Sequence, residues 1–180
     1  MMGRVVGSLC FLAVLVSTVS AATDDAIRVE VERPRLFPDT VLDPSARLNL
    51  AFDARFTNQG DAPLEIPDRA ATARVPGISK HGVEAQQSDG SWRTVEGGGD
   101  LMWKGDTVFP RCKLLNPKES LEAKGVSGPF VVFKSNLGGL WGTTATIRLH
   151  LLLTCKQRDG KLMSKIVKTN PFVLAIPPLP

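Results

Sequence analysis

Histidine is the side chain that most often accepts and donates protons near neutral pH, and this chain has two histidines. His81 lies in a segment of Gly, Ser and Lys, and His150 lies in a run that alternates apolar and polar residues. Neither has a nucleophile and an orienting acid close by in the sequence. Distant residues can still assemble a Ser–His–Asp group, so a hydrolase stays an alternative. We expect a protein that is not an enzyme and assign no catalytic residue.

The sequence also has few residues in patterns that bind a metal or a cofactor. A metal site needs clustered His, Cys, Asp or Glu side chains, and the sequence has no such cluster with ligand spacing. The glycine-rich stretches 97–99 and 138–139 precede no predicted helix, although a phosphate-binding loop needs one. Paired carboxylates for glycoside hydrolysis are left open, because geometry decides that case. We expect no metal and no cofactor.

The N-terminus has the pattern of a targeting segment. Arg4 precedes an apolar run over 5–16, and Val19-Ser20-Ala21 offers small residues for cleavage. This pattern predicts a signal peptide over 1–21 and one mature domain over 22–180, periplasmic or secreted.

The apolar run is shorter than the roughly 20 residues that span a bilayer. An uncleaved N-terminal anchor is the alternative, and Cys10 lies too early for lipidation at the cleavage point. No later apolar run approaches spanning length, so we expect no transmembrane segment after cleavage.

Two cysteines remain after the targeting segment, Cys112 and Cys155. An even count in an exported chain predicts a disulfide between them. It would close a loop of about 44 residues and contribute roughly 4 kcal/mol. Two separate buried thiols are the alternative, and the lack of a CxxC motif argues against thiol–disulfide exchange.

Charge is unevenly distributed along the chain. Residues 22–100 hold 9 basic and 14 acidic residues, whereas residues 101–180 hold 12 basic and 4 acidic ones. Two solvated faces would explain this asymmetry. The alternative is that the basic half meets an acidic partner or an anionic envelope surface. A nucleic-acid binder would be more strongly basic, with interleaved aromatic residues, so we expect no nucleic-acid partner.

Period-2 alternation of apolar and polar residues predicts strands almost throughout. In one strand Leu48, Leu50, Phe52, Ala54 and Phe56 share a face. Residues 69–80 are ambiguous, and a helical turn over 69–73 is one alternative there. The expected strands are 27–32, ended or placed at an edge by Arg33-Pro34, then 47–57, 62–67, 83–87, 92–95, 107–115, 120–123, 130–133, 145–156, 162–168 and 172–176.

The strand 145–156 predicts a buried face that includes Ile147, Leu149 and Cys155, with His150 on the opposite face. Asp-Gly turns at 88–91 and 158–161 predict two hairpins. Many short strands without a sustained helical pattern predict an all-β, immunoglobulin-like antiparallel β-sandwich. A small β-barrel is the alternative.

Three turn motifs carry a family resemblance. They are Phe56 to Leu64 (FTNQGDAPL), Asp89 to Trp92 (DGSW) and Leu115 to Leu121 (LNPKESL), with Lys118 where glycine is usual. Their order resembles bacterial secreted immunoglobulin-like domains and is weakly similar to the bacterial intracellular proteinase inhibitor family. The resemblance implies a sandwich fold and an inhibitor role. It carries over no inhibitory residue, because these motifs are turns.

Two loop-like segments hold large apolar residues that could anchor a partner. Trp92, in a hairpin, is expected to pack across strands. The alternative for Trp103 and Trp141 is that each folds back onto the core. The predicted partner-binding residues are Leu101, Met102, Trp103, Leu137, Leu140 and Trp141.

Together these observations predict a non-enzymatic exported binding protein of the bacterial cell envelope, of an inhibitor or immunity type, whose partner is another envelope protein. A structural or assembly module resembling a chaperone uses the same fold. A carbohydrate-binding module that stacks a glycan on Trp103 or Trp141 is the third hypothesis.

Overall fold

The computed structural model describes residues 26–38, 48–71, 76–96, 107–130, 140 and 142–178. Its named elements are all strands, paired antiparallel, so the predicted all-β class is confirmed. Within the described ranges no helix is long and apolar enough to cross a membrane. The strands are β1 (Ile27–Pro38), β2 (Leu48–Asn58), β3 (Leu64–Pro67), β4 (Ile78–Gln86), β5 (Trp92–Glu96), β6 (Cys112–Leu115), β7 (Ser120–Phe130), β8 (Thr144–Lys156), β9 (Leu162–Lys168) and β10 (Phe172–Ala175).

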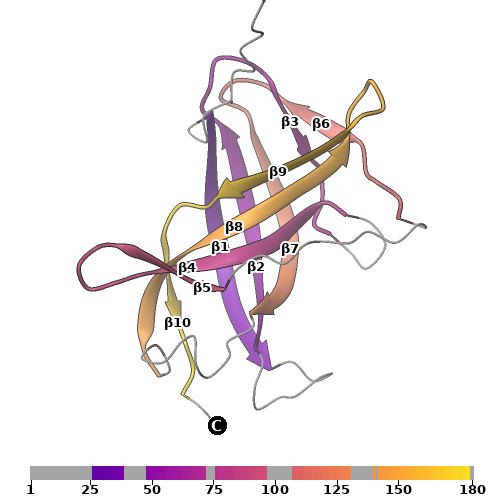
Figure 1. Cartoon of the computed structure of the whole chain (residues 1–180). Coiled ribbons are helices and arrows are strands. Elements are labelled where there is room, and N and C mark those ends of the chain that lie inside the picture. Colours follow the sequence, from indigo (N-terminus) through magenta and orange to yellow (C-terminus); the bar gives the residue numbers. More distant parts are fainter. Residues whose placement is uncertain are drawn as a thin grey trace, which may run out of the picture.

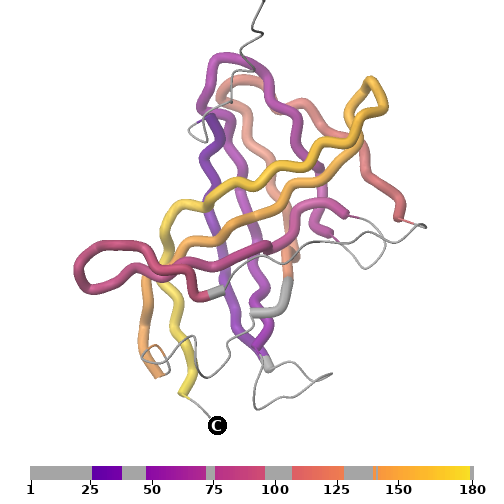
Figure 2. Tube along the Cα trace, viewed as in Figure 1, coloured from indigo at the N-terminus to yellow at the C-terminus, as the bar shows by residue number. Residues whose placement is uncertain are grey.

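The strands form three antiparallel sheets. One has the order β1-β2-β7, a second has the order β10-β8-β4-β5 with β9 also paired to β8, and β3 pairs with β6. The β4, β8 and β9 strands run across the β1, β2 and β7 strands (Figure 1). Figure 2 shows β1 and β7, which are far apart in the sequence, on either side of β2.

The core lies between the two larger sheets and uses one face of each central strand. Burial alternates residue by residue along β2, as its apolar spacing predicts. On β8 the predicted face is buried from Ile147 to Cys155. Each large apolar side chain buried here contributes roughly 1.5–3 kcal/mol relative to exposure.

Several predicted bounds are corrected. β1 continues past Arg33-Pro34, so the end at residue 32 is wrong, but β1 lies at the edge of its sheet, as the alternative predicted. The register shifts between Glu32 and Arg35, which accommodates a proline that cannot donate to the ladder. β6 begins only at Cys112, and Ala70 forms a bridge to Ile78 where a helical turn was one alternative. The expected strands 120–123 and 130–133 are also corrected, because β7 runs without a break from Ser120 to Phe130, and residues 131–133 lie outside the described residues.

The buried side chain of Asn58 ties the corner after β2 to β6. Its Nδ2 donates to the Ala62 carbonyl at 2.8 Å and to the Leu115 carbonyl at 3.0 Å. Its Oδ1 accepts from the Gly60 N–H at 2.9 Å. A Cβ at position 60 would lie 3.3 Å from that same Oδ1, which explains the glycine.

The backbone of Asn58 holds the turn that leads into β7. The Lys118 N–H donates to the Asn58 carbonyl at 2.8 Å, and the Asn58 N–H donates to the Glu119 carbonyl at 3.0 Å. Lys118 has φ +66°, in the left-handed region that favours glycine. This explains why glycine is usual at that position of the motif. Its Nζ donates to the Gln59 carbonyl at 3.0 Å.

We predict that Asn58→Ala lowers the free energy of unfolding by about 3 kcal/mol. The substitution leaves the carbonyls of Ala62 and Leu115 and the N–H of Gly60 without their hydrogen-bond partner. Urea denaturation measures the loss. The matched control is Thr57→Ala, whose hydroxyl contacts the Ser120 hydroxyl on an exposed face. An equal loss in both variants would contradict a special role for Asn58.

We predict that Lys118→Gly is more stable than Lys118→Ala by about 1 kcal/mol, because only glycine adopts the left-handed backbone without a steric cost. The comparison cancels the lost Nζ contact. Lys165 lies within β9, where glycine weakens the strand, so Lys165→Gly should be less stable than Lys165→Ala. Thermal denaturation of the four variants tests both orders.

Candidate functional site

Most of the predicted partner-binding residues lie outside the described part of the chain. These are Leu101, Met102, Trp103, Leu137 and Trp141. Leu140 is described, and it is partly buried and packs against the core. The Thr143 hydroxyl donates to its carbonyl at 2.8 Å. The apolar-loop hypothesis therefore stays a prediction, with Leu140 placed against the core.

The predicted disulfide is confirmed. Cys112, the first residue of β6, is bonded to Cys155, which is fully buried near the end of β8. The backbone beside it is joined as well, since the Lys156 N–H donates to the Pro110 carbonyl at 2.7 Å and Arg111 forms a bridge with Lys156. The disulfide thus holds two cation-bearing segments next to each other.

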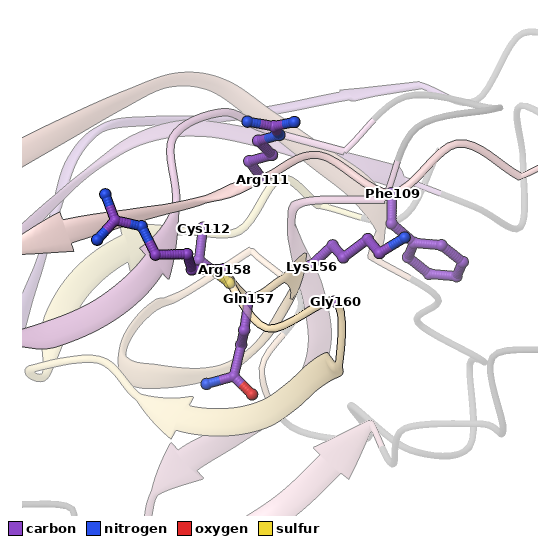
Figure 3. A pocket seen from close by; sticks show the side chains of 7 residues that line it. All are labelled: Phe109, Arg111, Cys112, Lys156, Gln157, Arg158 and Gly160. Carbon is purple, nitrogen blue, oxygen red and sulfur yellow. The ribbon is translucent and has the colours of Figure 1, made fainter.

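A cavity of about 580 Å³ lies beside the disulfide, and we call it the disulfide cleft. Its charged residues are Arg111, Lys156 and Arg158, all exposed. No described carboxylate lies within ion-pair distance of any of the three. Seven residues line it (Figure 3), namely Phe109, Arg111, Cys112, Lys156, Gln157, Arg158 and Gly160.

The nearby acids are already engaged. Asp159 pairs with Lys161 at 2.9 Å and also accepts from the Lys161 N–H at 3.0 Å. These contacts lower the pKa of Asp159 and keep its carboxyl charged. Glu65 accepts from the side-chain amide of Gln157. The described lining of the cleft therefore holds three cations and no carboxylate.

The cations of the cleft do not converge on one point. In Figure 3 the Arg111 and Arg158 side chains point in different directions, and the Lys156 ammonium lies toward the Phe109 ring. A single phosphate would need donors aimed at one centre. A spread of cations along a surface suits an extended acidic chain better.

Sequence reasoning placed the excess positive charge in the second half of the chain but did not locate this cleft. A local signal was present, because cations flank both cysteines. Arg111 and Lys113 flank Cys112, and Lys156 follows Cys155. Once a disulfide is predicted, these cations must lie close together.

A second polar cluster lies on the face of β8 that points away from the core. His150 is on this face, as predicted, with its Nε2 3.3 Å from Glu84 Oε2. Arg148 Nε donates to the same oxygen, and Lys168 Nζ lies 3.8 Å from it. The Arg148 guanidinium lies 4.2 Å from the centre of the Trp92 ring, a cation–π contact that fits the predicted cross-strand packing of Trp92.

This cluster limits the chemistry available to the histidines. Nε2 of His150 is buried and has no hydrogen bond among the described residues, and Glu84 is engaged by Arg148. His81 lies beside Gly82, which pairs with His150 across the sheet. In the described ranges no three His, Cys, Asp or Glu side chains gather as a metal site. The proximity of Glu84 to His150 depends on strand register, which local sequence does not reveal.

A scan against protein-family models found no match, and a search of curated proteins found none either. Among solved structures, a Northeast Structural Genomics Consortium target is 16% identical, with 86% of this chain and 89% of that chain covered and a TM-score of 0.35. A Bordetella pertussis protein described as ApaA is 20% identical, with 83% and 93% covered and a TM-score of 0.34. Similarity at this level carries no information on function.

We predict that Glu84→Gln destabilises the protein at neutral pH and that this effect becomes smaller as the pH falls. Burial raises the pKa of Glu84, but the Arg148 hydrogen bond and the charges of Arg148 and His150 outweigh it and hold this pKa below its ordinary value of 4.5. A lowered folded pKa gives stability that is present above about pH 4.5 and is lost as the pH falls through the folded pKa.

Urea denaturation between about pH 7 and about pH 3 tests this, with an expected loss of about 1–2 kcal/mol at about pH 7 that becomes smaller as the pH falls below about 4.5. Glu122→Gln, at an exposed ion pair with Arg55, is the matched control. An equal effect of Glu84→Gln at both pH values would show that the charge of Glu84 is unimportant.

Proposed function

We propose that this chain is a non-enzymatic, exported binding domain of the bacterial cell envelope, and that its disulfide cleft holds an acidic segment of a partner protein. The observation that carries the proposal is the set of three exposed cations beside the disulfide with no described carboxylate at ion-pair distance. Like charges held together without counter-ions repel one another. An anionic partner would relieve that repulsion.

The disulfide gives this cleft a fixed shape. The segments that carry Arg111 and Lys156 are joined covalently one residue away, through Cys112 and Cys155. Because the disulfide fixes these backbone segments before binding, less free energy is lost in ordering them when a partner binds. Exposed ion pairs add little affinity each, so their main effects are on association rate and salt dependence.

An inhibitor or immunity-type role is the form of this function that the family resemblance supports. A binding domain of this kind acts by covering a partner's surface, which needs shape and charge but no catalytic group. The resemblance rests on turn motifs, so the identity of the partner must come from experiment.

A structural or assembly role is the second candidate, because each described sheet ends in strands that pair on one side only, and β5 is one of them. Among the described strands β5 pairs only with β4. Figure 2 shows the tip of the β4–β5 hairpin projecting from the sheets. An added strand from another chain could continue the ladder there. The carbohydrate hypothesis rests on Trp103 and Trp141, which lie outside the described residues, so it stays a prediction.

Binding of a fluorescent poly-glutamate peptide tests the proposed cleft. We predict that Arg111→Glu with Arg158→Glu lowers affinity by more than about tenfold and flattens its salt dependence. The control is Arg93→Glu with Lys165→Glu, which changes net charge by the same amount on other strands. Equal losses in the two double variants would mean that only net charge matters, and the proposed cleft would be wrong.

The same double variants should be compared in cross-linking to envelope extract, together with Trp141→Ala. A partner lost from the cleft variant but retained by the Arg93 and Lys165 variant would support the proposal. A partner lost only from Trp141→Ala would place binding on the predicted apolar loop instead.

A further inference from the structure

A second cavity, of about 540 Å³, lies on the β1-β2-β7 sheet, away from the disulfide cleft. We call it the bulge cleft, because two irregularities of the sheet meet there. The register shifts between Glu32 and Arg35 on one side of β2 and between Phe52 and Ala54 on the other. Its lining residues are Arg33, Arg35, Ala51, Phe52, Asp53, Lys124 and Gly125.

The backbone of this cleft departs from ordinary strand geometry. Arg33 has φ +51° and Gly125 has φ +67°. A non-glycine residue in the left-handed region costs free energy and persists only where its surroundings hold it. Bulges of this kind are enriched next to functional sites, where they redirect a side chain. Here the bulge in β1 brings both Arg33 and Arg35 to the cavity.

Asp53 connects the two bulges. The Gly125 N–H donates to its Oδ1 at 2.8 Å, and Arg33 forms an ion pair with its Oδ2. The hydrogen bond from Gly125 and the charge of Arg33 lower the pKa of Asp53, so its carboxyl stays ionised. The single carboxylate lining the cavity is therefore fully engaged.

Among the described residues Arg35 and Lys124 form no ion pair, although the charge of Lys124 also lowers the pKa of Asp53. They reach the cavity from β1 and β7, on opposite sides of β2. Two nearby acids, Glu32 and Glu122, each pair with Arg55 at 3.0 Å. No described carboxylate lies at ion-pair distance from Arg35 or Lys124. The lining therefore holds three cations, Arg33, Arg35 and Lys124, against one carboxylate, Asp53, so positive charge is in excess.

We infer that the bulge cleft binds a small doubly charged anion, of the phosphate-monoester or dicarboxylate class, between Arg35 and Lys124. Arg35 can bind two oxygens of such a group in parallel, and Lys124 adds a compact charge from the other side. Asp53 is not part of the anion site: it engages Arg33 and the Gly125 N–H, and its negative charge lowers the positive potential of the cavity. This site shares no residue with the disulfide cleft, so either can fail without the other.

Calorimetric titration with inorganic phosphate and with succinate, in low-salt Tris buffer, tests the inference. Arg35→Ala with Lys124→Ala should weaken binding of the preferred anion by at least about tenfold. The matched control, Arg28→Ala with Lys113→Ala, removes the same charge from exposed positions elsewhere and should change affinity by less than about threefold.

Asp53→Asn separates binding from mere structural support. The asparagine Oδ1 can still accept from the Gly125 N–H, but the negative charge is gone and Arg33 is released. Anion affinity should then rise, opposite in sign to the Arg35 and Lys124 variant. Circular dichroism confirms that each variant is folded.

Binding of phosphate alone or of succinate alone would support the site and identify the class. Absence of binding by both anions would overturn the inference. So would an equal loss in the cleft variant and its control, or a loss of affinity in folded Asp53→Asn.

Discussion

The buried amide of Asn58 is the contact on which the arrangement of the sheets depends. It lies at the end of β2, and through side chain and backbone it reaches the corner before β3, the end of β6 and the turn into β7. One satisfied polar group therefore sets how the β3-β6 pair sits against the β1-β2-β7 sheet. Such a group is costly to bury unpaired, so alternative packings are penalised. The disulfide then joins the other end of β6 to β8.

Both candidate clefts lie where strands of this arrangement meet or depart from regular pairing. The disulfide cleft forms where β6 meets the end of β8, and the bulge cleft forms where β1 and β7 depart from regular pairing with β2. In each, three cations are gathered by strands that are distant in the sequence. The two clefts differ in their carboxylates. Asp53 lines the bulge cleft and pairs with Arg33, whereas Asp159 does not line the disulfide cleft and pairs with Lys161 in its own turn.

The strands that local sequence predicted best are those with strict alternation and a strong turn. The β8–β9 hairpin has both, and its bounds agree closely with expectation. The extension of β1 past Arg33-Pro34 was missed, because a bulge lets proline stay in a strand without donating a hydrogen bond. The contact of Glu84 with His150 was missed for a different reason, since it depends on a register between β4 and β8. The left-handed backbone of Lys118 was not predicted either, although glycine is usual at that position of the motif.

The disulfide has a further consequence for the integrity of the chain. Cys112 and Cys155 enclose β6, β7 and most of β8 within one covalent loop. A single proteolytic cut anywhere inside that loop leaves both new ends attached to the same molecule. The nicked protein would keep its strands at high local concentration and could stay assembled, whereas a cut outside the loop releases a fragment. The effect of a proteolytic cut therefore depends on its position. A cut between the cysteines leaves the pieces covalently joined, and a cut elsewhere does not.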